Sequence, residues 1–249
     1  MRCAGSGKGS TTASIVRDRQ IAEVGFDSFD LSDAWESEGY RRDEGKNYTF
    51  DKDVVIRTKA SGRDDKVIPA QRYYKGGIIV DEEDEKRLVT INMNGHRLTL
   101  NTTADSTQYS AAGIAVVGGD LEIRNAIGVN INLTGTKKVG SGIYAEGYST
   151  KDASVVIQNG GEGAGAVKIR NQVSGEKEAA IEAKGSGVKK AIVEIQGLVD
   201  IEQDNDNLLK ATRSSEIHIG GGQLSIGDAA NDAKLAEISS KGKVLINAK

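Results

Sequence analysis

The sequence predicts an all-β protein, a parallel β-helix in which short strands stack coil upon coil. From residue 47 onward, aliphatic and polar residues alternate in short segments that are separated by Gly, Asn, Asp and Ser. Three kinds of strand recur in a fixed order along this part of the chain, which is typical of a repeat architecture. Aromatic residues make up only 4% of the 249 residues, and the hydrophobic 37% is mostly Val, Ile, Leu and Ala. This composition suits a long, thin core filled by aliphatic side chains.

Residues 1–46 precede this pattern and are predicted to form an irregular N-terminal segment or a cap, while the β-helix spans residues 47–249. The stretch 13–26 carries apolar residues at positions 15, 16, 21, 22 and 24, a spacing that also fits a short amphipathic helix. Residues 27–45 are acidic and show no strand-like alternation. A cap in this part of the chain would cover the strand edges of the first coil.

The first strands of the β-helix are expected at the short aliphatic runs 54–56 and 78–80. In residues 89–93, Val, Ile and Met alternate with Thr and Asn, and in residues 98–100 two leucines flank a threonine. The Asn-Gly pair at 94–95 separates these two strands. It is typical of a corner, because both residue types tolerate a positive φ.

Five later repeats align on a five-residue strand whose second positions are 29, 38, 28 and 27 residues apart. The copies of this first strand are 113–117, 142–146, 180–184, 208–212 and 235–239. A second strand follows each copy, with the aliphatic pairs Leu121/Ile123, Val155/Ile157, Val193/Ile195, Ile217/Ile219 and Val244/Ile246. A third strand follows in four repeats, with Val129/Ile131/Leu133, Val167/Ile169, Val199/Ile201 and Leu224/Ile226.

The alternation gives each strand one dry face and one wet face. One repeat of three such strands cannot bury its dry face alone, but parallel stacking of equivalent strands buries all of them in one column. The pattern therefore predicts about six or seven three-stranded coils. An antiparallel meander also has alternating strands, but it predicts turns of two to five residues and no recurring strand classes. The longer connection at 147–153, inserted without a change of strand order, favours the coil.

Charge and cysteine content narrow the classes of function. The chain has 33 Lys and Arg residues and 36 Asp and Glu residues, which gives a net charge of −3. It therefore lacks the excess of positive charge that is typical of nucleic-acid-binding proteins. Cys3 is the single cysteine, which excludes an intramolecular disulfide and a multi-cysteine metal site. Residues 1–10 are polar and glycine-rich, without the apolar stretch of a secretory signal. If the protein is exported, this sequence is expected to be a processed or excised piece.

The segments 90–101 (TINMNGHRLTLN) and 142–146 (GIYAE), together with the Val-x-Ile strands, resemble passenger domains of autotransporters, the type V secreted proteins of Gram-negative bacteria. Residues 47–56 (NYTFDKDVVI) look like the opening coil of adhesin-type members. The resemblance covers residues 47–249. It implies a right-handed, pertactin-like β-helix displayed outside the outer membrane, where cysteine-poor passengers are usual. It also implies linkage to an outer-membrane β-barrel, which residues 223–248 do not match.

Two glycine-rich segments invite a ligand-binding interpretation that their residues do not support. Residues 5–11 (GSGKGST) lack the P-loop pattern, since Gly9 follows Lys8 where that motif requires Ser or Thr. Residues 160–165 (GGEGAG) approximate the start of a calcium-binding nonapeptide, but Gly165 stands where an aspartate ligand is required. We expect a flexible terminal tail in the first case and a corner loop in the second.

The two histidines, His96 and His218, are expected to be exposed polar residues, because neither has a cysteine or a second histidine at metal-ligand spacing. A Ser-His-Asp triad stays open as an alternative, although the sequence has no GxSxG elbow. The acceptor pattern Asn-x-Ser/Thr occurs at 47–49, 101–103 and 132–134, which matters only in a eukaryotic setting. No metal, cofactor or nucleic-acid partner is predicted.

Carboxylates are the strongest catalytic candidates, since β-helical polysaccharide lyases and glycosidases use acid pairs or Ca²⁺-binding aspartates. Asp200 and Glu202 are expected on one outward face, at a separation that would suit a retaining enzyme. Asp204 and Asp206, which follow them, are further candidates. The acidic residues 81–85 are expected to form a solvated charged loop. The coils offer almost no aromatic platforms for sugar rings.

The sequence therefore predicts a non-enzymatic cell-surface or secreted passenger fragment, a rigid stalk that presents loops for adhesion or cell–cell contact. The connections 60–76 and 147–153 are the expected contact surfaces for a host or bacterial receptor, protein or glycan. No catalytic, cofactor-binding or metal-binding residue is predicted. The alternatives are a β-helical polysaccharide lyase or glycosidase, a phage tailspike-like segment, and a structural repeat without a ligand of its own.

Overall fold

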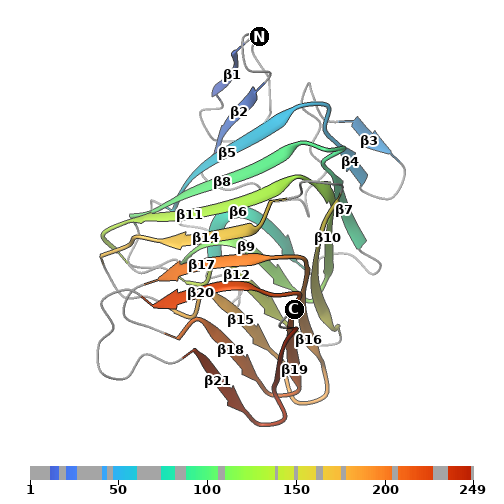
Figure 1. The fold of residues 1–249 in the computed structure, drawn as a ribbon, viewed down its shortest axis with the longest axis vertical. Coiled ribbons are helices and arrows are strands. Elements are labelled where there is room, and N and C mark those ends of the chain that lie inside the picture. The colour runs from blue at the N-terminus through green and yellow to red at the C-terminus, as the bar shows by residue number, and fades with distance from the viewer. Residues whose placement is uncertain are drawn as a thin grey trace, which may run out of the picture.

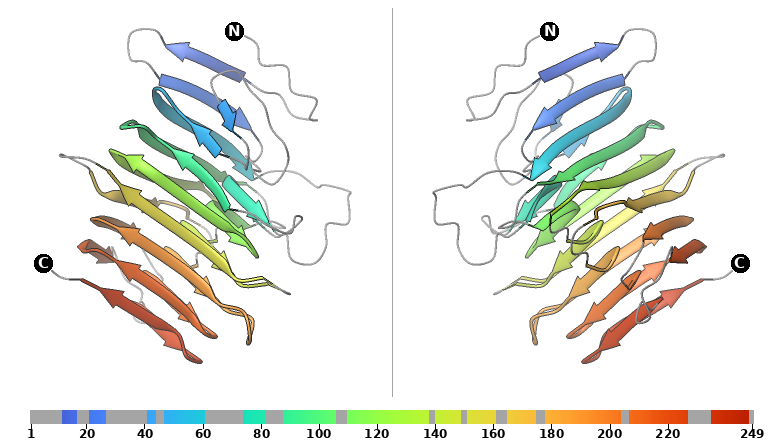
Figure 2. Two further views of the ribbon diagram at one scale, coloured as in Figure 1. Left: turned by 90° about the vertical axis from the view of Figure 1, so that its right-hand side faces the viewer. Right: turned by 90° about the vertical axis from the view of Figure 1, so that its left-hand side faces the viewer.

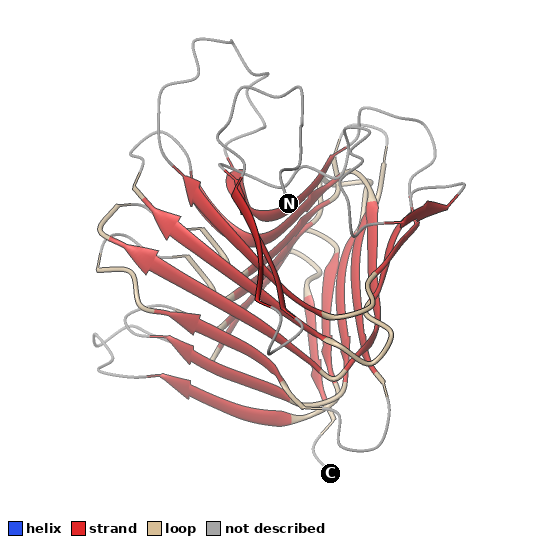
Figure 3. Ribbon diagram, turned by 90° about the horizontal axis from the view of Figure 1, so that it is seen from above, coloured by secondary structure: helices blue, strands red, loops and turns tan. Residues whose placement is uncertain are grey.

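The structure, a computed structural model of the chain, describes residues 12–16, 21–26, 41–43, 47–60, 74–81, 88–105, 110–137, 140–148, 151–160, 165–174, 178–203, 207–226 and 235–247. The strands within these ranges form three sheets, named A, B and C, around one core (Figure 3). The described residues contain no helix.

Sheet A contains, in order across the sheet, β1 (Thr12–Val16), β2 (Ile21–Phe26), β5 (Asp53–Ala60), β8 (Arg97–Ala104), β11 (Gly128–Gly135), β14 (Val167–Asn171), β17 (Val199–Gln203) and β20 (Gly222–Ile226). Sheet C contains β3 (Arg41–Asp43), β4 (Asn47–Thr49), β7 (Leu88–Asn92), β10 (Asp120–Ala126), β13 (Ala153–Asn159), β16 (Ala191–Gln196), β19 (Ser215–Ile219) and β22 (Lys243–Ile246). Sheet B contains β6 (Tyr74–Asp81), β9 (Ser110–Val117), β12 (Ile143–Glu146), β15 (Ile181–Lys184), β18 (Leu209–Thr212) and β21 (Ala236–Ser239).

From β4 onward the chain visits sheets C, A and B in turn, and each pass makes one coil. Six complete coils, from β4–β5–β6 to β19–β20–β21, are followed by β22 of a seventh. The strands of successive coils pair in parallel, and the colours follow one another down the stack in Figures 1 and 2. The predicted parallel β-helix of about six or seven three-stranded coils is confirmed, and the antiparallel meander is excluded.

Equivalent aliphatic residues stack in register, as the repeat predicts. Ile143 of β12 pairs with Ile114 of β9 on one side and with Ile181 of β15 on the other, and Ile181 pairs with Leu209 of β18. All four side chains are fully buried. Burying one such side chain contributes about 1.5–3 kcal/mol, so each column holds its coils together through nearest neighbours.

The N-terminal residues differ from one expectation. Residues 12–16 and 21–26 form the strands β1 and β2, which pair antiparallel, and so the helix considered for 13–26 is wrong. Strand β2 also pairs in parallel with β5, and β3 pairs antiparallel with β4. These pairings give hydrogen-bond partners to backbone groups at the ends of sheets A and C. They decide the structure of residues 12–16 and 21–26, because the local apolar spacing fits the period of a helix and that of a strand.

The predicted corner at 94–95 is confirmed by the backbone. Asn94 and Gly95 adopt φ values of 47° and 82°, and in the next coil Asn125 adopts 53°. The Asn125 side-chain amide donates to the Oδ1 atom of Asn92 at 3.0 Å, and the backbone N–H of Asn94 donates to the same atom, so Asn92 at the end of β7 links the two corners. Asparagine tolerates this left-handed region better than other residues with a side chain.

Candidate functional site

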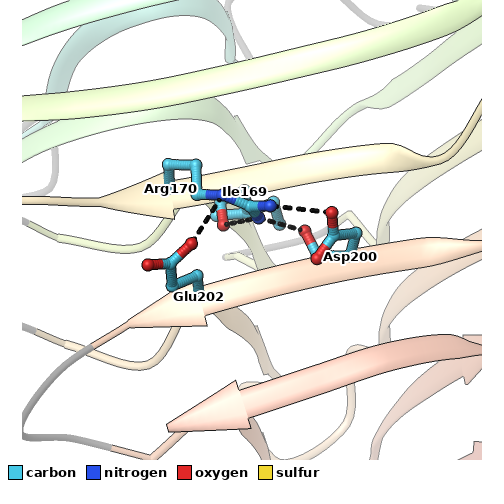
Figure 4. Close-up of polar contacts among 4 residues, drawn as sticks. All are labelled: Ile169, Arg170, Asp200 and Glu202. Atoms are coloured by element: carbon cyan, nitrogen blue, oxygen red, sulfur yellow. Dashed lines mark hydrogen bonds and ion pairs between the residues drawn. The ribbon is translucent and has the colours of Figure 1, made fainter. Parts of the chain in front are cut away.

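The outer face of sheet A carries the predicted acid pair, and an arginine from the neighbouring coil lies between its two members. Alternation places Arg170 outward on β14 and Asp200 and Glu202 outward on β17. Nη2 of Arg170 is 2.7 Å from Oδ2 of Asp200, and Nε is 2.9 Å from Oε2 of Glu202 (Figure 4). Nη1 also donates to the backbone carbonyl of Asp200 at 3.0 Å.

These contacts make Arg170 a clamp between two coils. The planar guanidinium offers several donors in fixed directions, which suits two carboxylates on one strand. The prediction that Asp200 and Glu202 share one face is confirmed. Because both carboxylates bond the same guanidinium, the arrangement has a structural explanation that requires no substrate.

Each histidine lies beside one carboxylate. Nδ1 of His96 is 3.8 Å from Oδ1 of Asp53, and Nε2 of His218 is 2.9 Å from Oε2 of Glu216. Hydrogen bonds from Lys243 and His218 lower the pKa of Glu216. Within the described ranges, no group of three or more His, Cys, Asp or Glu residues is placed to hold a metal ion.

Several sequence candidates lie outside the described residues: 5–11, 61–73, 82–85, 161–164, Asp204 and Asp206. The connection 147–153 is described except for residues 149 and 150. Tyr148 and Lys151 form a two-way backbone bridge there, with N–O distances of 2.9 and 2.8 Å. This bridge gives the base of the connection a defined shape on the side of the stack.

The outer face of sheet B holds a group of polar side chains that the sequence analysis did not single out, the sheet B cluster: Tyr144, Glu146, Glu182, Lys184 and Lys210. The Tyr144 hydroxyl donates to Oε2 of Glu146 at 2.6 Å, and Nζ of Lys184 is 2.8 Å from the other oxygen of Glu146. Nζ of Lys210 is 3.9 Å from Oε1 of Glu182. The cluster spans three successive coils.

Glu182 is the unusual member of the sheet B cluster, because it is buried although its position points outward. Glu182 is only 6% exposed, and desolvation by burial raises the pKa of its carboxyl group to about 7. Lys210 and Lys184 lower the pKa, while Glu178 and Glu146 raise it. Strand alternation gives no signal for this burial, since it treats Glu182 like the more exposed Lys184.

Buried amides form a second feature that the aliphatic pattern did not reveal. Asn171 and Gln203 are register partners in the inward column that also contains Leu133, and both are buried. Nδ2 of Asn171 donates to Oε1 of Gln203 at 2.9 Å. Gln203 in turn donates to the carbonyls of Glu178 and Asn207, at 2.9 and 3.2 Å. The amides thus tie the A-to-B connections of two coils to the core.

The geometry defines a class of fold, the parallel β-helix, with ion pairs and hydrogen bonds between coils on its outer faces. No protein family, no curated protein and no solved structure matches the chain. No helix long and apolar enough to cross a membrane occurs in the parts of the chain that are described.

Proposed function

We propose that this chain is a non-enzymatic scaffold of the passenger type, displayed at a Gram-negative cell surface or secreted, whose stack presents connections for adhesion. The observation that carries the proposal is the in-register parallel stack of six complete coils around one aliphatic column. Contacts between nearest neighbours allow such a stack to fold coil by coil after passing unfolded through a pore. A hydrogen-bonded stack is also stiff, as a stalk must be.

Clamps between coils support the scaffold role. Arg170 joins β14 to β17, and on the outer face of sheet A the Asn132 amide donates to the Asn101 side chain at 2.8 Å, joining β11 to β8. Lys243 and Glu216 join the last two coils on sheet C, at 2.8 Å. These pairs engage polar groups of the flat faces in holding the coils together, and the connections are the expected surfaces for recognition.

Bead adhesion tests the proposal. Fluorescent beads coated with the purified chain are applied to epithelial monolayers and to Gram-negative cells, beside albumin-coated beads. We expect binding above albumin, reduced by Tyr148→Ser combined with Lys151→Ser in the connection 147–153. The control Lys168→Ser, on the flat face of sheet A, should retain binding. Chain-coated beads that bind neither cell type above albumin would count against adhesion.

A second assay addresses the enzymatic alternative. The chain is incubated with acidic and neutral polysaccharides, and new reducing or unsaturated ends are measured. We expect no cleavage. Cleavage that disappears when Asp200→Asn and Glu202→Gln are combined would contradict the scaffold proposal.

A further inference from the structure

The buried carboxyl group of Glu182 has an unusually poor set of polar partners. Glu182 is only 6% exposed, and its one ion pair with a described residue is with Nζ of Lys210, at 3.9 Å. Among the described residues it has no hydrogen bond. A buried carboxylate without hydrogen bonds costs far more free energy than a neutral carboxylic acid in the same place.

Glu146, on the neighbouring strand, shows what a satisfied carboxylate on this face looks like. It accepts a hydrogen bond from Tyr144 at 2.6 Å and pairs with Lys184 at 2.8 Å. Tyr144 is the register partner of Glu182 on β12, but its hydroxyl donates to Glu146 instead. Among the described residues, the same face therefore gives Glu146 two close partners and Glu182 only a lysine at 3.9 Å.

The charges around Glu182 come from four elements. Lys210 lies on β18, Lys184 on the same strand β15, and Glu146 on β12, while Glu178 belongs to the connection that precedes β15. The two cations lower the pKa of Glu182 and the two anions raise it, and burial has a larger effect than any of them. Desolvation consequently dominates and raises the pKa of Glu182 to about 7.

We propose that Glu182 is a protonation switch that makes the packing of β15 against β18 looser as its carboxyl group ionises. The neutral acid fits the buried site, whereas the carboxylate draws water or Lys210 toward it and strains the coil. This switch is independent of the adhesive role, since it concerns only the stability of the stack.

The direction of the effect follows from proton linkage. The folded state holds its proton up to about pH 7, whereas the unfolded chain releases it near 4.5. The folded state therefore binds more protons between these values, and its stability falls as the pH rises through this window. The contribution of Glu182 to the folding equilibrium constant should fall on the order of fifty- to a hundredfold from pH 5 to pH 8.

Urea unfolding of the full chain at pH 5 and pH 8 tests the switch. We expect the ratio of folding equilibrium constants, wild type over Glu182→Gln, to fall by that factor between the two values. The matched control Glu194→Gln, on the outer face of β16, should keep a nearly constant ratio. A constant ratio for Glu182→Gln would overturn the proposal.

Two direct readouts keep the test decisive if the variant folds poorly. Carbon-13 NMR of the wild-type chain should place the Glu182 carboxyl titration near pH 7, and a midpoint below 5 would overturn the proposal. Amide hydrogen exchange in β15 and β18, corrected for the intrinsic pH dependence, should be faster at pH 8 than at pH 5. Equal corrected rates would contradict the loosening.

Discussion

The last strands of sheets B and C carry aliphatic residues at the same inward positions as the strands before them, but their environments differ. Ile219 of β19 is 2% exposed, whereas its register partner Ile246 of β22 is 40% exposed. Likewise Ala211 of β18 is buried, while its partner Ile238 of β21 is 53% exposed. At this end of the stack, a core position is therefore buried only when a further coil lies beyond it.

The opposite end of the stack is closed differently. There β1 and β3 pair antiparallel with β2 and β4, and so strands running in the reverse direction occupy the edges of sheets A and C. Strands β20, β21 and β22 are the last in their sheets. Parallel stacking extends a solenoid, whereas an antiparallel pairing ends the repeat.

The largest expected effect contrasts the two kinds of inward position. Ile143→Ala should lower the free energy of unfolding by about 3–5 kcal/mol, because the side chain is fully buried between Ile114 and Ile181. Ile246→Ala should cost about 1 kcal/mol, since much of its side chain already contacts water. Urea denaturation measures both values, and equal losses would contradict the comparison.

A smaller effect is expected where a middle coil needs glycine. A Cβ atom at Gly142 would lie 2.6 Å from Cγ2 of Ile169 and 3.0 Å from the carbonyl oxygen of Ala180. Gly142→Ala should therefore destabilise the fold by about 1–3 kcal/mol.

The control for Gly142→Ala is Gly128→Ala, whose Cβ would meet only the Arg97 Nε atom at 3.4 Å and a carbonyl oxygen at 3.9 Å. This variant should be neutral or slightly stabilising. Thermal unfolding of the two variants decides the point, and similar melting temperatures would show that the inward column has more room than the structure gives it.

The smallest effect is expected on the outer faces. Arg170→Ala should cost about 1 kcal/mol, because its ion pairs with Asp200 and Glu202 are only partly buried. Arg124→Ala, which removes a contact with Glu122 inside one strand, should cost less, since it joins no coils. The order of these two losses in urea unfolding tests whether clamps between coils matter more than pairs within a strand.

Much of the fold could be predicted because the inward aliphatic residues recur at matching positions of successive coils. The spacing of Ile114, Ile143, Ile181 and Leu209 was enough to predict one column, and the structure stacks them in register. Strands β1 and β2 were missed because their sparse apolar residues fit a helix and a strand equally well. Pairing with β5, which lies beyond the local sequence, decides between them.

The outer faces were harder to predict. Asp200 and Glu202 were expected on one face, but that Arg170 lies between them depends on the register of two coils 30 residues apart. The burial of Glu182 depends on its neighbours on the outer face of sheet B, and alternation carries no information about them. Asn171 and Gln203 could not be predicted as core residues, because an aliphatic pattern gives no signal for buried amides that satisfy each other.

Register-specific disulfide formation tests the stack most directly. In a Cys3→Ser background, Asn130→Cys and Lys168→Cys would face each other across β11 and β14, since these residues are register partners. Parallel neighbours lie about 4.8 Å apart, within disulfide reach, whereas a two-residue offset brings the Cα separation to about 8 Å. The account predicts rapid intramolecular oxidation of the pair at 130 and 168 and none for the offset pair Asn130→Cys with Arg170→Cys. Equal oxidation of both pairs, or faster oxidation of the offset pair, would contradict the in-register stack.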